Sequence, residues 1–277
     1  MKTNLRTTWL GVLLLVVVGG LVWVVLRMRE PVDQDKPLSV WLDQYGSNHW
    51  MHPGGDLDNQ ALAAIRRIGT NAIPIYLRFM TIRQSPIKMK MIALVPKQWQ
   101  IRLHVPNALD YQNELHRYRV LGAFGIAALG PDAKPVVPIL MGLLNAQDPD
   151  TRDNAVFALR SLGPVAVDAL PGLIKCLKDP DSSIRWNAML SLGEIHQEPE
   201  RVIPILIENL GAPDQGLRRG ALWSLRRFGG AAKSAVPNLL KLFDDPDAGV
   251  RSEATNLVKA IDLEAAAKAG VKWSEKD

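Results

Sequence analysis

Apolar residues recur along most of this chain in two alternating helical patterns. In the first pattern, Ile184, Ala188, Leu192 and Ile195 lie at offsets of 0, 4, 8 and 11, which places them on one face of an α-helix. The second pattern begins with a proline in the first helical turn, where the missing N–H is not needed. Leucines then follow at helical spacing. The alternation predicts pairs of helices that each bury one face.

Both patterns repeat with a period of 33 residues. A period of this length is typical of a solenoid or a similar array of repeats, and the helical content of each unit favours an all-α solenoid of about six helix pairs. The first helices share an arginine and a small residue: Arg119, Arg152, Arg185, Arg218 and Arg251; Gly122, Ala155, Ala188, Ala221 and Ala254. The second helices share a proline and an apolar stripe: Pro138, Pro171, Pro204 and Pro237; Leu140, Leu173, Leu206 and Leu239; Leu144, Leu177, Leu210 and Phe243.

The connections between these helices carry turn residues. A glycine turn such as Leu162-Gly163-Pro164 separates the two helices of a unit, and Asp179-Pro180-Asp181 or a close variant separates one unit from the next. Proline ends a helix and aspartate is well suited to cap the following one. We therefore expect the regular repeats over residues 116–261 and a closing helix within residues 262–277.

In its spacing and residue types this unit resembles the HEAT repeat, and within that class the bacterial HEAT-like type also found in proteins related to phycobilin lyases. The resemblance covers about residues 57–262. It implies an Asp–Arg ladder along the stack, formed by the five repeat arginines together with Asp179 and Asp245, with Asp179 beside Arg185 and Asp245 beside Arg251. Ala212 replaces the aspartate beside Arg218, so a gap in the ladder is expected there.

The amino-terminal end differs from the repeats. Residues 7–26 are uncharged, mostly Leu, Val and Gly, with Trp9 and Trp23 near the two ends. Twenty helical residues span a hydrocarbon core of roughly 30 Å, so residues 1–29 are expected to form an uncleaved signal anchor with one transmembrane helix. A cleaved signal peptide is the alternative, but its apolar run is shorter and ends at small residues. The bacterial inner membrane is the expected location, with the soluble part on the exported side.

Two less regular segments lie between the anchor and the regular repeats. Residues 30–56 are expected to form a linker, acidic over Glu30–Lys36, and a short amphipathic helix that ends at Gly46. The repeat domain is then expected over 57–277, with an irregular first repeat interrupted by an insert at 81–115.

Charge is distributed unevenly along the chain. The formal net charge is +5, and residues 59–131 contain ten basic and two acidic residues. The basic insert, with Lys88, Lys90 and Trp99, is interpreted as a surface for an anionic membrane or an acidic partner, or as an elongated repeat with solvated lysines. Trp186, Trp223 and Arg219 form a second candidate partner site, because aromatic residues and arginine dominate interface hot spots; packing between repeats is the alternative.

The chain offers little material for catalysis. It has one cysteine and five histidines, and it lacks a Gly-rich phosphate loop, a nucleophile elbow and a metalloprotease motif. Cys176 is expected to be a small buried apolar residue, and His49 and His52 to lie in a loop. The hypothesis is a membrane-anchored, non-catalytic scaffold for protein partners, without a cofactor, metal or small-molecule substrate. The alternatives are an enzyme or lyase relative that uses the concave face, and a binder of nucleic acid or anionic membrane through residues 59–131, of which nucleic acid is disfavoured by the near-neutral charge elsewhere.

Overall fold

The computed structural model describes residues 30–51, 56–83, 85–95 and 108–269, so the predicted anchor at residues 7–26 lies outside the described chain. The chain divides into two compact units with the boundary between Ile75 and Tyr76. The described residues are helical apart from one short hairpin, which agrees with the all-α prediction.

The first unit begins with a hairpin of strands β1 (Val32–Asp33) and β2 (Lys36–Pro37), in which Val32 pairs with Pro37 and Asp33 with Lys36. Its two turn residues, Gln34 and Asp35, have φ of 49° and 61°, as a tight two-residue hairpin turn requires. The acidic linker expected here is therefore an ordered turn.

Side chains from two helices hold this hairpin in place. The indole Nε1 of Trp41, in α2 (Leu38–Met51), donates to the Asp33 carbonyl at 3.0 Å. Arg67, in α3 (Asp56–Ile68), donates to both carboxylate oxygens of Asp33, at 3.1 and 2.6 Å. This bidentate pair lowers the pKa of the Asp33 carboxyl.

Helix α2 packs against α3 through a small apolar core. Leu38, Trp41 and Leu42 from α2 and Ala64 and Ile65 from α3 are almost completely buried. The helix does not end at Gly46 but continues to Met51, which corrects the loop expected around His49. A glycine ends a helix when it adopts a left-handed conformation, and Gly46 does not have a positive φ. His52 lies outside the described residues.

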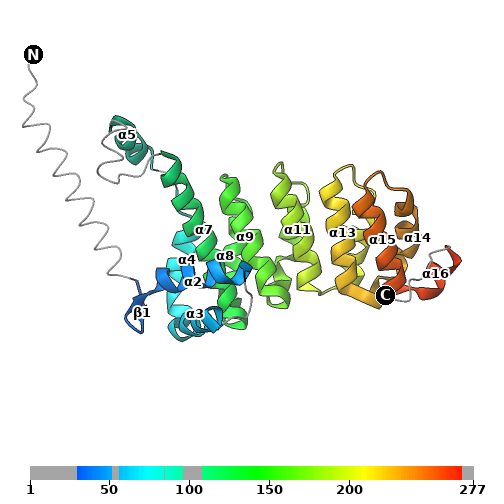
Figure 1. Cartoon of the computed structure of the whole chain (residues 1–277), viewed down its shortest axis with the longest axis horizontal. Helices are drawn as coiled ribbons and strands as arrows, with labels where there is room; N and C mark the ends of the chain where they lie inside the picture. The colour runs from blue at the N-terminus through cyan, green and yellow to red at the C-terminus, as the bar shows by residue number, and fades with distance from the viewer. Residues whose placement is uncertain (1–29, 52–55, 84, 96–107, 270–277) are drawn as a thin grey trace, which may run out of the picture. The chain divides into compact units, whose positions relative to one another are not determined.

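The second unit is a stack of repeated helix pairs, and the predicted solenoid is confirmed there. Figure 1 shows its first helices in a row, each packed against the next. These are α7 (Ala108–Leu129), α9 (Pro149–Leu162), α11 (Ser182–Ile195), α13 (Gln215–Phe228) and α15 (Ala248–Ile261). The second helices are α8 (Val137–Leu143), α10 (Leu170–Cys176), α12 (Pro199–Asn209), α14 (Val236–Lys241) and the closing α16 (Leu263–Lys268).

The turns inside the pairs follow the sequence pattern, with one exception. The 3₁₀ segments η2 (Gly130–Val136), η3 (Gly163–Ala169) and η4 (Gly229–Ala235) begin with glycines at φ of 57°, 54° and 52°. A glycine also begins η1 (Gly69–Ala72), which leads to α4 (Ile73–Met80). Between α11 and α12 no glycine is present, and His196 and Glu198 both adopt φ of 49°. The connection there is shorter and α12 is longer, with 11 residues.

Small residues let the first helices approach closely. The repeat alanines Ala155, Ala188, Ala221 and Ala254 are completely buried. At the crossing of α11 and α13, a Cβ added to Gly193 would lie 2.7 Å from the Cα of Ser224. The buried Ser224 hydroxyl donates to the Met189 carbonyl at 2.8 Å, which joins the two helices at the same crossing.

The structure differs from the expected insert at residues 81–115. Helix α5 (Pro86–Leu94) forms inside it, capped by the Ser85 hydroxyl, which accepts from the Lys88 N–H at 3.3 Å. Its Ile92 packs with Tyr111 and Leu115, because α7 already begins at Ala108.

The expected burial of Phe243 also differs: the short segment η5 (Leu242–Asp244) changes the helical register, so that Leu242 is buried and Phe243 is only half-buried.

Gly193→Ala is expected to destabilise the protein by about 1–3 kcal/mol, since the new methyl group meets the Ser224 backbone. Gly142→Ala in α8 is the matched control, because its Cβ would point into open space. It is expected to stabilise the helix by up to about 1 kcal/mol. Urea unfolding followed by circular dichroism measures both, and equal effects would contradict the close approach of α11 and α13.

Candidate interaction site

Four of the five repeat arginines, Arg152, Arg185, Arg218 and Arg251, bind the turn that precedes their own helix. The guanidinium Nη1 of Arg152 donates to the carbonyls of Ala146 and Gln147 at 2.9 and 3.1 Å. The same two bonds recur at Arg185, Arg218 and Arg251, to the carbonyls six and five residues earlier. The arginine thus supplies donors to backbone carbonyls of the turn between two helices, which no helical hydrogen bond uses.

The rest of the guanidinium bridges to the following repeat. Arg152 donates to both carboxylate oxygens of Asp179, at 2.8 and 3.0 Å, and both side chains are at least 87% buried. Arg218 forms the corresponding ion pair with Asp245: its Nη2 donates to one carboxylate oxygen at 3.1 Å, and its Nε lies 2.9 Å from the other oxygen without hydrogen-bond geometry. The carboxylates of Asp179 and Asp245 therefore pair with the arginine of the preceding repeat. Arg185 contacts Asp179, and Arg251 contacts Asp245, through the backbone carbonyl of the aspartate and not through its carboxylate.

The gap expected at Ala212 does not occur. Arg185 donates to Asp214, which lies two residues later, at 3.1 and 2.6 Å. The second oxygen of this carboxylate accepts from the Gly216 N–H at 2.8 Å and caps α13. One aspartate thus performs two tasks, and the arginine next to it holds its pKa below the usual range. At the far end, among the described residues Arg251 binds only carbonyls of its own repeat.

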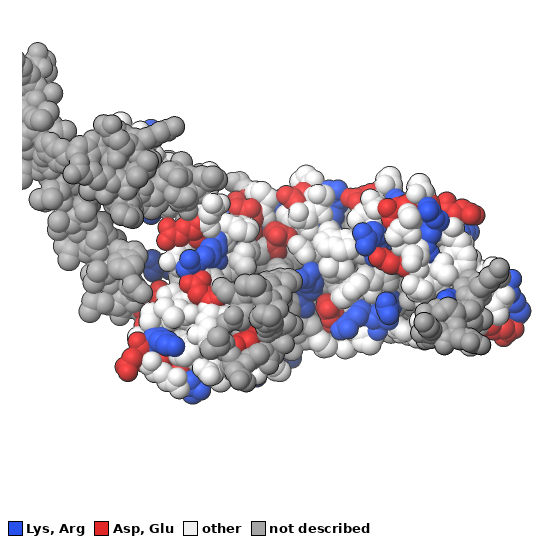
Figure 2. Space-filling model, viewed as in Figure 1, with Lys and Arg blue, Asp and Glu red and all other residues white. Residues whose placement is uncertain are grey.

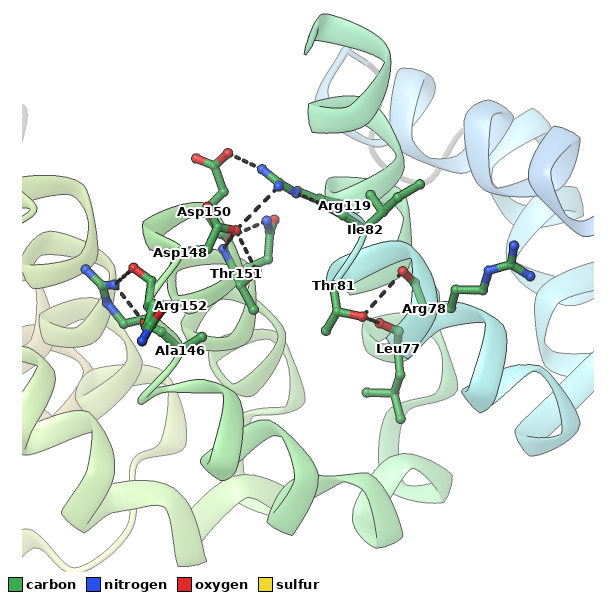
Figure 3. A network of polar contacts seen from close by, with 12 residues as sticks. Leu77, Arg78, Thr81, Ile82, Arg119, Ala146, Asp148, Asp150, Thr151 and Arg152 are labelled. Carbon is green, nitrogen blue, oxygen red and sulfur yellow. Dashed lines mark hydrogen bonds and ion pairs between the residues drawn. The ribbon is translucent and has the colours of Figure 1, made fainter. Parts of the chain in front are cut away.

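Arg119 begins this ladder with a different set of partners. Its Nε donates to the Ile82 carbonyl at 2.9 Å, and its two terminal nitrogens face Asp150 and Asp148, as Figure 3 shows. Asp148 also accepts from the Thr151 N–H and hydroxyl, at 3.1 and 2.6 Å, and caps α9. An open cavity of about 530 Å³ lies beside this cluster, lined by polar side chains that include Arg83, Gln112, Asn113, His116 and Gln147.

The outer face of the first helices carries polar contacts between repeats. Arg160 donates to Asn187 at 3.0 Å, and Asn187 donates to Asp153 at 2.8 Å. Burial raises the pKa of the Asp153 carboxyl. Figure 2 shows basic and acidic side chains next to one another over this face. The other pairs across repeats are Gln215–Asp247, Arg219–Glu253 and Arg227–Glu194.

Of the predicted partner-binding residues, Arg219 belongs to this network and Trp186 packs against the next repeat. The indole of Trp186 is half-buried and covers Gly216 and Gly220 of α13, and Arg219 binds Glu253 at 2.9 Å. Trp223 is 36% exposed, with the Arg227 guanidinium 5.7 Å from its ring centroid. Arg219 is thus engaged with the next repeat and Trp186 covers glycines of the next repeat, whereas Trp223 contacts Arg227 of its own helix.

The second helices present a different surface, which we call the second-helix face. Ile139 in α8 is 48% exposed, and half-buried aliphatic side chains recur at one register: Met141, Ile174, Ile207 and Leu240. The four repeat prolines are exposed beside them. Among the described residues, α8, α10 and α14 contribute no side chain to an ion pair, and α12 contributes only Arg201, which binds Glu198 at 3.1 Å.

Sequence reasoning did not identify this aliphatic row, although its signal is present. The four side chains are separated by 33 residues each, like the ladder arginines. Their partial exposure could not be predicted, because Ile and Leu at helical spacing indicate residues that are buried in the core. The first helices contain a similar row with the same spacing, which the sequence analysis did not identify either. It consists of Phe124, Phe157, Leu190 and Trp223, and the exposure of these side chains increases along the stack from the buried Phe124 to the exposed Trp223.

The cysteine and the basic residues that were candidates for catalysis or partner binding lie in different parts of the second unit. Cys176 is buried in α10, and desolvation raises the pKa of its thiol to about 11, which opposes thiolate formation. In the described part of the chain, no three His, Cys, Asp or Glu side chains gather in a way that suits a metal ion. Lys88 lies 4.0 Å from the ring centroid of Tyr111, Lys90 is exposed, and Trp99 lies outside the described residues.

The repeat geometry agrees with a comparison of the sequence with known families. Residues 136–226 and 203–269 match a family model described as HEAT repeats. This part of the chain is built of HEAT repeats. The predicted resemblance is therefore confirmed for the HEAT repeats themselves, and the anchor is a separate prediction that the comparison does not concern.

The solved structures with a related arrangement include designed and engineered proteins. An engineered protein from a structural genomics consortium is 19% identical, covers 84% of this chain and 97% of its own, and has a TM-score of 0.48. A computationally designed armadillo repeat protein for modular peptide recognition is 16% identical, with coverages of 81% and 100% and a TM-score of 0.43. No curated protein matches the sequence.

Two stretches of the HEAT repeats, residues 111–143 and 149–176, are long and apolar enough to cross a membrane by length and composition alone. Each consists of two helices separated by a 3₁₀ turn, η2 or η3, that begins with a left-handed glycine. Their apolar residues, such as Leu140 and Leu159, are buried between repeats. We therefore interpret both stretches as core helices of the stack.

Asp179→Asn is expected to lower the free energy of unfolding at pH 7 by about 1–2 kcal/mol, since the charge-assisted bonds to Arg152 weaken. The bound arginine lowers the pKa of the Asp179 carboxyl in the folded state. The stabilisation is therefore present above the unfolded-state pKa of about 3.9 and is lost as the pH falls through the folded-state value.

The difference between Asp179→Asn and the unmodified protein should accordingly shrink as the pH falls from about 5 through the lowered folded-state pKa. Urea unfolding at a series of pH values measures it. Glu198→Gln is the control, because Glu198 pairs with Arg201 on the surface, with 45% and 48% of the two side chains exposed. It should change the stability by less than about 0.5 kcal/mol. A constant difference at all pH values would contradict the role of the carboxylate.

Proposed function

We propose that this protein is a non-catalytic scaffold, tethered to a membrane by residues 7–26, that binds a protein partner along the second-helix face. The HEAT repeats support an interaction scaffold in general. The observation that carries the choice of face is the row of Met141, Ile174, Ile207 and Leu240, together with the exposed Ile139. An extended apolar surface of this kind marks an interaction site in soluble domains.

The two faces of the stack differ in what they leave for a partner. On the first helices, the long polar side chains are engaged between repeats, as in Arg160–Asn187–Asp153 and Arg227–Glu194. A partner that bound there would have to displace these contacts and desolvate the charges. On the second-helix face, binding would cover apolar side chains and leave few ion pairs to break. The physical cost of binding is therefore lower on the second-helix face.

The repeat also gives the face its regular spacing. The Arg–Asp ladder fixes each unit against the next, since Arg152, Arg185 and Arg218 each bind both their own turn and the following repeat. A row of aliphatic side chains on a rigid stack is preorganised, so little conformational entropy is lost when a partner binds. This favours an extended polypeptide segment as the ligand.

The chemistry of the described residues supports a non-catalytic role. Cys176 is the one cysteine of the chain, and its burial opposes use as a nucleophile. The cavity beside Arg119 is lined by side chains that already bind one another, namely Arg119 with Asp148 and Asp150. These three residues form an ion cluster that joins α7 to α9 and gives them a structural role.

The choice of face is tested by photo-crosslinking in cells. A benzophenone amino acid at Ile139 or Ile205 on the second-helix face is expected to give a discrete crosslinked partner, identified by mass spectrometry. The same amino acid at Ser161 or Trp223 on the first helices is the control, since these two positions are exposed. Crosslinks to the same partner that are equally strong from Ser161 would contradict the assignment of the face.

The tether is tested separately by fractionation. The full chain is expected to stay with membranes after an alkaline carbonate wash, and deletion of residues 1–29 is expected to release it. Lys2→Gln with Arg6→Gln, outside the uncharged run, is the control and should leave the chain with the membranes. Mass spectrometry of the isolated protein should find the intact amino terminus, whereas a terminus beyond residue 26 would show that the segment is a cleaved signal.

A further inference from the structure

Helix α5 has two apolar sides, of which one packs against other described residues and the other is exposed. Ile92 and Met89 face α7, where Ile92 packs with Tyr111 and Leu115. On the other side, Ile87, Met91 and Leu94 are 72%, 38% and 81% exposed. These three residues are separated by four and three positions, so they lie on one line along the helix. We call this line the α5 stripe.

Basic side chains flank the α5 stripe. At 100° per residue, Lys88 and Lys90 fall on opposite sides of the line through Ile87, Met91 and Leu94, and both lysines are exposed. Lys88 also lies 4.0 Å from the ring centroid of Tyr111, so its position beside α7 is defined. Arg83, just before the helix, is exposed as well.

The charge of the surrounding chain is entirely of one sign. Between Asp58 and Asp110 the sequence contains eight Lys and Arg and not a single Asp or Glu. An exposed apolar line with lysines on both sides, in a segment without acidic residues, is complementary to the surface of an anionic bilayer. The apolar residues would enter the boundary between headgroups and acyl chains, while the lysine stems extend toward the lipid phosphates.

We propose that α5 is an interfacial membrane helix: the α5 stripe inserts into the surface of an anionic bilayer, and Lys88 and Lys90 bind its phosphate headgroups. This contact extends the membrane tether of the proposed function but has its own residues. With three apolar side chains, α5 alone binds weakly. A tether in the same chain raises its effective concentration at the membrane, which makes a weak contact sufficient.

The contact is tested with the full chain in lipid vesicles. In a Cys176→Ala background, a fluorescent dye is attached through Leu94→Cys on the α5 stripe or, as control, through Ser161→Cys, which is exposed on α9. The vesicles contain phosphatidylcholine with nitroxide-labelled lipid, with or without about one third phosphatidylglycerol. Quenching of the dye at position 94 is expected to be at least three times that at position 161 in the anionic vesicles, and to decrease in neutral vesicles and at high salt.

Charge variants separate the lysine contact from general attraction. Lys88→Glu with Lys90→Glu is expected to abolish the excess quenching at position 94. Lys175→Glu with Lys241→Glu, which changes the net charge of the second unit equally, is expected to leave it intact. Equal quenching at positions 94 and 161 would overturn the proposal. So would protection of the dye at position 94 from iodide without vesicles, because the stripe would then be covered by the protein itself.

The same samples separate this proposal from the tether. Recovery of the chain with neutral vesicles on flotation reports residues 7–26, whereas quenching at position 94 in anionic vesicles reports α5. A chain that floats only with anionic vesicles and is quenched at position 94 contradicts the tether and supports the α5 contact. A chain that floats with both but shows no excess quenching contradicts the α5 contact alone.

Discussion

Apolar burial between consecutive helix pairs is the constraint on which the rest of this structure depends. A single pair, such as α9 and α10, presents apolar side chains on both sides and has no core of its own. Ala155, Leu159 and Leu173 are completely buried in the stack, where α9 contacts both α7 and α11. Small residues at the crossings, such as Gly193 against Ser224, set how closely the first helices approach. The stack is therefore stable as a series of neighbours, as repeat proteins are.

The Arg–Asp ladder adds direction and register to this burial. Arg152, Arg185 and Arg218 each bind carbonyls of their own turn and a carboxylate of the next repeat, so these repeats cannot slide along one another without breaking charge-assisted bonds. The replacement of Asp by Ala at position 212 shows how the ladder tolerates variation. The capping residue Asp214 has a second carboxylate oxygen available for Arg185, so the bond is kept with a different residue.

The stack separates structural from exposed surfaces. Polar residues of the first helices are engaged between repeats, whereas the second-helix face keeps aliphatic side chains that the fold only half-buries. Helix α5 adds a third surface, apolar and basic, in a segment that departs from the repeat. Exposed apolar side chains therefore occur both in α5, where the sequence departs from the repeat, and on the second-helix face, where they follow the repeat. Both surfaces are places where a contact with another molecule costs the fold little.

The sequence by itself determined the helix pairs, their period and the arginines of the ladder, because each depends on local spacing. Prolines in the first turn, glycines at left-handed turns and aspartates at the helix starts act within a few residues, and they could be read directly. Only the tertiary structure decided the partners of the ladder, the helix inside the insert and the exposure of Ile139 or Trp186. Whether Asp179 binds Arg152 or Arg185, and whether an apolar side chain meets a neighbour or solvent, depends on how one repeat is placed against the next. That placement results from packing over many residues, which no local pattern contains.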